Sequence, residues 1–127
     1  MRKYDHLFFD LDNTLWDFAA NSRKAMQITM EQKNILPRLE SFDAYWKVYE
    51  EINHALWNDY HHKQITKQKL ISDRFSLSLN KFQIFDLDWE GLNRNYLANM
   101  ALQTELFPKT LDTLEILKAK GYQLHII

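Results

Sequence analysis

Apolar residues recur at different spacings along this chain, and the spacings predict its elements. The run Tyr4 to Phe9 becomes apolar towards its end, which predicts a short β-strand that enters an acidic loop. From about Ala19 onwards the apolar positions recur at intervals of three and four, which predicts amphipathic helices. The run from Tyr122 to Ile127 is again rich in strand-forming residues. The expected order is therefore strand, helical insert, helix, strand.

Four helices are expected in the insert. The first spans about Ala19 to Asn34 and ends before Pro37, and the second runs to about Tyr60. Polar residues suited to N-capping precede the later helices, namely Ser41, Thr66, and either Asp86 or Asp88. The predicted apolar faces contain Met26 and Met30, then Tyr45, Tyr49, Ile52 and Leu56, then Leu70, Ile71, Phe75 and Leu79, then Trp89, Leu92, Tyr96 and Met100. Such a succession predicts a small four-helix bundle.

The two predicted strands are expected to pair in parallel, joined by a long crossover. A helix after Pro108 leads into the second strand, and Gly121 fits the end of that helix. Two parallel strands cannot cover both faces of their sheet, and the chain ends inside a hydrophobic strand. We therefore expect this sequence to be the N-terminal part of a longer protein.

Composition excludes several classes of protein. Of the 127 residues, 46% are hydrophobic and 14% aromatic, which is too apolar for a disordered chain. A net charge of −1 gives no reason to expect nucleic acid or an anionic membrane as a partner. The sequence has no cysteine, no signal-peptide pattern and no apolar run near the roughly 20 residues that span a bilayer. A cytoplasmic protein is the expectation.

Two carboxylates follow the first predicted strand. Asp10 and Asp12 stand two positions apart, so their side chains leave the strand on the same side. In an open parallel sheet this place is the crevice beyond the carboxyl ends of the strands, where ligands bind. Adjacent carboxylates repel each other, so the pattern favours a bound cation or two carboxylates with different catalytic roles. A plainer interpretation is that both residues only begin a turn.

The segment Phe9-Asp10-Leu11-Asp12-Asn13-Thr14-Leu15 resembles the first signature motif of the haloacid dehalogenase-like (HAD) phosphohydrolases. Residues 106–122 resemble the segment that leads to the second motif of that family, and the helical stretch resembles its inserted cap. Trp16-Asp17-Phe18 and the aromatic helices resemble, more weakly, the pyrimidine 5′-nucleotidase-like branch. The resemblance implies an α/β fold: a partial doubly wound (Rossmann-like) core at residues 1–16 and 103–127, with a helical cap domain at residues 17–102. The C-terminal part of the core would be missing.

The resemblance also implies roles for single residues. Asp10 would be the nucleophile that forms an aspartyl-phosphate, and Asp12 the general acid and base. Magnesium (Mg2+) would bind the Asp10 carboxylate and the Asp12 carbonyl oxygen. Thr14 would help to fix the loop, and Trp16 stands directly beside it as a candidate for positioning the substrate or the loop. Asp12 favours phosphoryl transfer over carbon–halogen cleavage, because the dehalogenases typically lack this second acid.

Other candidate residues have plainer explanations. A second Asp-x-Asp, Asp86-Leu87-Asp88, lacks the threonine and is better explained as a helix cap. His54, His61 and His62 lack the spacing of a joint metal site, so we expect surface or packing roles. Lys63, Lys67, Lys69 and Arg74 are expected to form a solvated basic face. The tyrosines at 45, 49 and 96 are expected to pack in the core, with stacking on a nucleobase as the alternative.

The expected function is therefore magnesium-dependent hydrolysis of a small phosphorylated metabolite, with a nucleoside monophosphate as the first candidate. Residues 1–127 alone are expected to be nearly inactive, because the family's later Ser or Thr, Lys and acidic metal ligands are absent. A phosphomutase or phosphotransferase is the alternative within enzymes. A non-catalytic helical interaction module is the alternative outside them. Self-association through exposed sheet is also expected to be open to the isolated chain.

Overall fold

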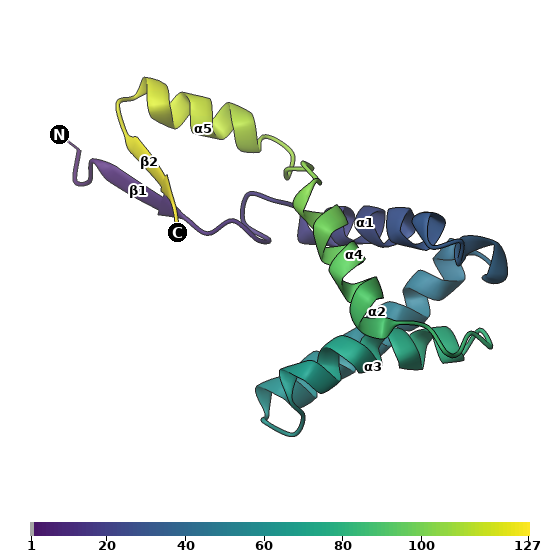
Figure 1. Ribbon diagram of the computed structural model, residues 1–127. Coiled ribbons are helices and arrows are strands. Elements are labelled where there is room, and N and C mark those ends of the chain that lie inside the picture. Colours follow the sequence, from purple (N-terminus) through teal and green to yellow (C-terminus); the bar gives the residue numbers. More distant parts are fainter. Residues whose placement is uncertain (1) are drawn as a thin grey trace. The chain divides into compact units, whose positions relative to one another are not determined.

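The computed structural model describes residues 2–127 (Figure 1). Their elements follow in the order β1 (His6–Phe9), α1 (Phe18–Gln32), η1 (Leu36–Arg38), α2 (Phe42–His61), α3 (Lys67–Asn80), α4 (Trp89–Ala101), α5 (Thr110–Ala119) and β2 (Gln123–Ile126). They fall into two compact units. The sheet unit contains the residues up to Ser22 together with Gln103–Ile127, and the helical unit contains Arg23–Leu102. The predicted order of strand, helical insert, helix and strand is confirmed.

The helices of the helical unit begin where the sequence predicts caps. The Ser41 hydroxyl accepts a hydrogen bond from Ala44 N, and the Thr66 hydroxyl accepts one from Lys69 N. Asp88, rather than Asp86, caps α4 by accepting from Gly91 N. Each side chain satisfies a backbone N–H group that has no partner within its own helix. The first helix ends two residues before the predicted Asn34, which adopts a positive φ of 55° and so leaves the helical conformation.

An aromatic core holds the helical unit together. Tyr45, Tyr49 and Phe75 are almost fully buried, and their rings lie 6.0 Å apart in successive pairs. Helix α2 packs against α3, and α3 packs against α4. Burial of several such side chains, at about 1.5–3 kcal/mol each, is the main stabilising contribution in a unit of this size. The prediction that these tyrosines pack in the core is confirmed.

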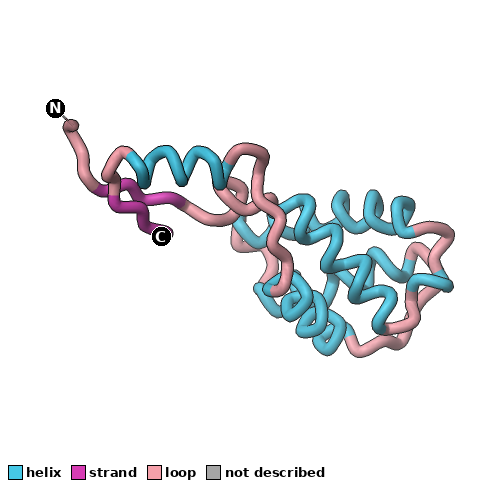
Figure 2. Tube along the Cα trace, turned by 90° about the horizontal axis from the view of Figure 1, so that it is seen from above, coloured by secondary structure: helices cyan, strands magenta, loops and turns pink. Residues whose placement is uncertain are grey.

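The sheet unit is built on two parallel strands. The pairing runs from His6 opposite Gln123 to Phe9 opposite Ile126. Helix α5 runs beside these strands in both views, as Figure 2 shows, and it packs against β2. The strand begins two residues later than predicted, because pairing starts where Gln123 N donates to the Asp5 carbonyl. Tyr4, which the prediction included, is 60% exposed.

No helix in the described part of the chain is both long and apolar enough to cross a membrane.

Candidate functional site

The two acids of the sequence motif lie where β1 ends. Asp10 follows the last residue of the strand, and the carbonyl oxygen of Phe9 accepts a hydrogen bond from Ile127 N at 2.9 Å. The backbone immediately before Asp10 is therefore held by the end of β2. The strand predicted ahead of the acids is present, and the acids stand at the carboxyl end of a parallel sheet, where ligands bind in open α/β folds.

A tight loop carries the acids away from the sheet. The Leu11 carbonyl oxygen accepts hydrogen bonds from the backbone N–H groups of Thr14, Leu15 and Trp16, at 3.2, 3.0 and 2.9 Å. Asn13 adopts a positive φ of 59°, a conformation that asparagine tolerates better than most residues. Its N–H donates to the Trp16 carbonyl at 2.9 Å. Backbone atoms therefore fix the path of the chain from residue 11 to residue 16.

Both carboxylates face outward from this loop. Asp10 and Asp12 are exposed, and neither makes a side-chain hydrogen bond or ion pair with any residue that the structure describes. The Asp12 carbonyl oxygen likewise accepts no hydrogen bond from the described backbone. These oxygen atoms are thus available to a ligand or cation, while the loop that presents them is held by its own main chain.

Thr14 and Trp16 differ in how they contribute. The side chain of Thr14 is exposed, and its backbone N–H takes part in the Leu11 turn. Trp16 is half-buried, and its indole Nε1 donates to the Gln103 carbonyl at 3.0 Å. The backbone of Trp16 also pairs with Leu106. In this structure Trp16 links the acidic loop to the returning chain, which fits the loop-positioning alternative of the sequence prediction.

Two residues that follow the loop make side-chain hydrogen bonds that the sequence prediction missed. Asp17 accepts a hydrogen bond from Ala20 N at 3.0 Å and so caps α1. The side chain of Asn21, 1% exposed, donates to the Glu105 carbonyl at 2.8 Å and accepts from Glu105 N at 2.9 Å. An Asp just before a helix is a recognisable capping signal. The contact with Glu105 joins residues far apart in the chain, so local patterns carry no sign of it.

The basic residues near α3 do not share one environment. Lys63, Lys67 and Lys69 are exposed, as expected. For Arg74 the prediction of a solvated face is wrong, because only 7% of it is exposed. Its guanidinium lies over the rings of Phe75 and Tyr96, at 5.3 and 5.4 Å, and donates to the Asn93 side-chain carbonyl. Cation–π contacts and this hydrogen bond compensate part of the cost of burying the charge.

His54 and His61 lie on α2, and His62 is its C-cap residue. His54 is exposed, the His61 ring lies 5.6 Å from that of Trp57, and a His62 ring nitrogen lies 2.8 Å from the Asn58 carbonyl oxygen. Among the described residues, no group of three or more His, Asp or Glu side chains is placed to hold a metal ion. The metal-binding role expected of Asp10 and Asp12 stays a prediction.

Burial changes the acidity of two core tyrosines. It raises the pKa of Tyr45 and of Tyr49 well above the usual phenol value, because the phenolate would lose its hydration. The hydroxyl groups of Tyr45 and Ser78 lie 3.2 Å apart and share a hydrogen bond, which offsets a smaller part of the effect on Tyr45. Both groups are neutral core residues at ordinary pH.

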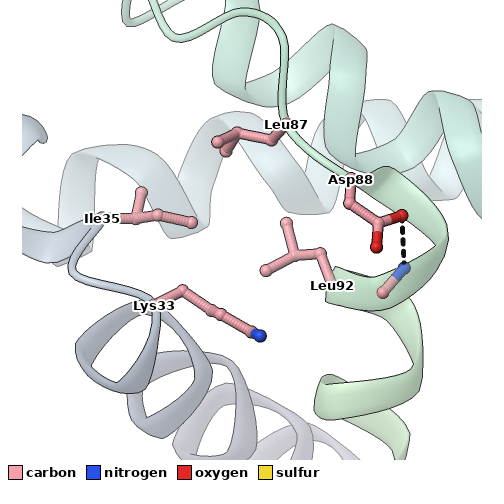
Figure 3. Close-up of a pocket in the computed structure, with 6 residues that line it drawn as sticks. Lys33, Ile35, Leu87, Asp88 and Leu92 are labelled. Atoms are coloured by element: carbon pink, nitrogen blue, oxygen red, sulfur yellow. Dashed lines mark hydrogen bonds between the residues drawn. The ribbon is translucent and has the colours of Figure 1, made fainter.

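The helical unit also contains a small pocket, shown in Figure 3. Its volume is about 120 Å³, and its lining comprises Lys33, Ile35, Leu87, Asp88, Gly91 and Leu92. The Asp88 carboxylate is engaged in capping α4, as the dashed line to Gly91 N in Figure 3 marks. The remaining lining is mainly apolar. Apart from Lys33, the pocket offers little of the chemistry expected around a phosphate group.

Comparison with known proteins decides the family. A family model for haloacid dehalogenase-like hydrolases matches residues 4–127. The chain belongs to this family. The resemblance seen in its acidic motif is thereby confirmed.

Two curated relatives extend the comparison. The chain is 32% identical over 122 residues to pyrimidine 5′-nucleotidase PynA of Streptococcus pneumoniae, covering 96% of this chain and 49% of PynA. It is 27% identical over 127 residues to the HAD-hydrolase YfnB of Bacillus subtilis, covering 100% of this chain and 52% of YfnB. This HAD-like chain thus spans about half the length of the curated relatives it matches.

A solved structure agrees with the fold. The crystal structure of B. subtilis YfnB bound to magnesium matches with a TM-score of 0.84 at 24% sequence identity, over 99% of this chain and 53% of YfnB. The arrangement of helices with a small parallel sheet is therefore that of a HAD hydrolase, over about half of the related structure.

Proposed function

We propose that this chain is part of a magnesium-dependent phosphohydrolase and supplies its nucleophile and its general acid and base. One observation carries the proposal. In a chain of the HAD-like hydrolase family, Asp10 and Asp12 follow β1 on a backbone-fixed loop, with both carboxylates exposed and without protein partners among the described residues. Carboxylates without protein partners are free to contact a cation or a substrate.

The reaction has two steps in this proposal. An Asp10 carboxylate oxygen attacks the phosphorus atom, the bond from phosphorus to the leaving oxygen breaks, and Asp12 donates its proton to that oxygen. Asp12, now a carboxylate, takes a proton from water as the water oxygen attacks the aspartyl-phosphate. The bond between Asp10 and phosphorus then breaks, which releases inorganic phosphate and restores both acids.

The donor atoms suit a hard cation. The Asp10 carboxylate and the Asp12 carbonyl oxygen are unpaired within the described chain, and oxygen atoms are the ligands that Mg2+ prefers. In this proposal these two groups hold the ion, with further ligands from outside residues 2–127. When bound, magnesium supplies positive charge that offsets the charge of the phosphoryl group.

The proposed substrate is a pyrimidine nucleoside monophosphate. The relative from S. pneumoniae, a pyrimidine 5′-nucleotidase by name, supports this choice. In the same proposal residues 1–16 and 103–127 belong to a doubly wound core, and residues 17–102 form a cap that selects the substrate. The aromatic packing of the helical unit supports a cap with a stable fold of its own.

Phosphate release tests the proposal. We would measure hydrolysis of uridine and cytidine monophosphates, with and without Mg2+, by the full product of the gene and by residues 1–127 alone. The expected result is magnesium-dependent release by the full product and little or none by residues 1–127. Asp10→Asn should lower kcat by at least about 10³-fold and Asp12→Asn by at least about 10²-fold, because the nucleophile and the proton donor are lost.

The controls separate the alternatives. Asp86→Asn changes the other Asp-x-Asp segment and should leave kcat unchanged. Product analysis with sugar phosphates distinguishes transfer to another acceptor from hydrolysis. Turnover that is unaffected by Asp10→Asn would refute the assignment of the nucleophile.

A further inference from the structure

The side chain of Asn21 pairs with the backbone of the chain that returns from the helices. Its amide nitrogen donates to the Glu105 carbonyl at 2.8 Å, and its amide oxygen accepts from Glu105 N at 2.9 Å. One side chain thus satisfies both backbone groups of one residue, as a neighbouring strand would. Both residues belong to the sheet unit, and Asn21 is only 1% exposed. The place of Glu105 therefore depends on this amide.

The returning chain in turn holds the end of the acidic loop. The carbonyl oxygen of Glu105 accepts a second hydrogen bond, from Asp17 N at 3.0 Å. Trp16, one position earlier, pairs with Leu106 in an antiparallel bridge. The backbone at the end of the loop is therefore paired with the segment that the Asn21 amide holds.

Trp16 carries this pairing on to Asp12. Trp16 N donates to the Leu11 carbonyl at 2.9 Å, and the Trp16 carbonyl accepts from Asn13 N at 2.9 Å. These two bonds form a parallel bridge between Trp16 and Asp12, and they hold the backbone on both sides of Asp12. A continuous series of hydrogen bonds thus connects the Asn21 side chain with the backbone that presents the second acid.

Asp10 is held from another direction. The carbonyl of Phe9, the residue before it, accepts a hydrogen bond from Ile127 N at the end of β2. This contact lies outside the series that leads from Asn21 to Asp12. A shift of the returning chain should therefore move Asp12 more than Asp10.

We propose that Asn21 is a positioning residue for Asp12 and acts through the backbone of the returning chain. This inference rests on the proposed function, in which Asp12 donates a proton to the leaving oxygen while Asp10 attacks the phosphorus atom. A proton donor must lie within hydrogen-bond reach of its target, and a misplacement of about 1 Å can cost about 10²-fold in rate. Loss of the Asn21 amide should therefore impair proton donation more than the attack.

Two substrates with different leaving groups test this role in the full product of the gene. The ribose oxygen of uridine monophosphate needs a proton as it leaves, whereas the phenolate of p-nitrophenyl phosphate leaves without one. The ratio kcat/KM compares free enzyme and substrate with the transition state of the attack, so later hydrolysis of the aspartyl-phosphate does not enter it. Asn21→Ala should lower kcat/KM at least about tenfold for uridine monophosphate and less than about threefold for p-nitrophenyl phosphate.

The comparison of substrates separates positioning from folding. A smaller fraction of folded enzyme would lower kcat/KM for both substrates by the same factor. Asn21→Ser is a milder second variant, because its shorter side chain cannot pair with both backbone groups of Glu105, and it should show the same selective loss. Ser22→Ala is the matched control and should leave both values unchanged, since the Ser22 hydroxyl bonds to the Ala19 carbonyl of its own helix.

Asp12→Asn separates this inference from the function on which it rests. It should also lower kcat/KM more for uridine monophosphate than for p-nitrophenyl phosphate. If it does so while both Asn21 variants affect the two substrates equally or not at all, the positioning role is overturned and the proposed function stands. If Asp12→Asn affects both substrates equally, the role of Asp12 as proton donor fails, and the positioning role of Asn21 fails with it.

Discussion

The helical unit and the sheet unit are built in different ways. Every fully or nearly buried large apolar side chain in the described residues lies between Ala25 and Tyr96, inside the helical unit. Large apolar side chains are exposed in both units, including Phe8, Leu111 and Ile127 in the sheet unit and Leu102 in the helical unit. Its acidic loop is held by hydrogen bonds between backbone groups and by single side chains such as Trp16. The unit with the larger core is therefore not the one that carries the candidate site.

This difference separates stability from chemistry. Core packing supplies most of the stability of a small unit, whereas binding and catalytic residues of proteins are often exposed polar groups on loops. Substitutions in the core of the helical unit should then lower stability, whereas substitutions of the exposed acids on the loop should leave stability nearly unchanged. The following experiments test that contrast.

The largest effect is expected in the aromatic core. Phe75 is fully buried, so Phe75→Ala should lower the free energy of unfolding by about 3–5 kcal/mol. Phe8→Ala in the sheet unit is the matched control, with an expected loss below about 1 kcal/mol because Phe8 is mostly exposed. Urea denaturation followed by circular dichroism measures both. Equal losses would show that the contrast between the units is wrong.

The next effect concerns the contact between Asn21 and Glu105. Asn21→Ala leaves the N–H of Glu105 without its partner and removes one donor to its carbonyl, which should cost about 2 kcal/mol. Hydrogen exchange at the Glu105 amide should accelerate. Ser22→Ala is the control, because the Ser22 hydroxyl bonds only to the Ala19 carbonyl of the same helix. Unchanged exchange at Glu105 in the Asn21 variant would rule out this role.

Alkaline pH should act on the helical unit. The pKa values of Tyr45 and Tyr49 are raised in the folded state above the unfolded value of about 10. Their contribution to stability is therefore complete below pH 10 and is lost as the pH rises above it, by up to about 1.4 kcal/mol per pH unit for each proton.

Denaturation series from pH 8 to pH 11 measure this loss. Replacing both tyrosines with phenylalanine should flatten the dependence, whereas Tyr4→Phe, at an exposed position, should not. An identical slope in the double variant would exclude these two groups as its source.

The smallest effect is expected at a helix cap. Asp88→Ala removes the acceptor of the Gly91 N–H group and should lower stability by about 1 kcal/mol. Asp86→Asn, two positions earlier, should change it by less than about 0.5 kcal/mol, since Asp86 is exposed and has a positive φ of 58° that asparagine also adopts. Thermal unfolding distinguishes the two. A loss of equal size at both positions would contradict the assignment of the cap.

Local patterns predicted most of the elements. Ser41, Thr66 and Asp88 mark helix starts because capping needs only a polar side chain beside free N–H groups. The spacing of apolar residues also predicted α2, α3 and α4, because helical periodicity is a local pattern. Tyr4 was wrongly placed in the strand because pairing, rather than composition, decides where a strand begins.

Local patterns could not predict the contacts between segments that are distant in the sequence. Trp16 meets Gln103, and Asn21 meets Glu105, only after the helical unit returns the chain to the sheet. The burial of Arg74 had a weak signal, since it follows Leu70 by four positions and precedes Ser78 by four on one helix face. Because arginine is charged, Arg74 was instead expected on a solvated face. The roles of Asp10 and Asp12 stay predictions, supported by their place on the loop.

The carbonyl oxygen of Leu11 accepts hydrogen bonds from three successive backbone N–H groups. The shape of the turn therefore depends on main-chain hydrogen bonds and not on the side chains at positions 10 and 12, on either side of Leu11. The side chains at positions 10 and 12 can therefore be exchanged without disturbing these backbone hydrogen bonds. An inert amide at position 10 or 12 should therefore report on reactivity alone.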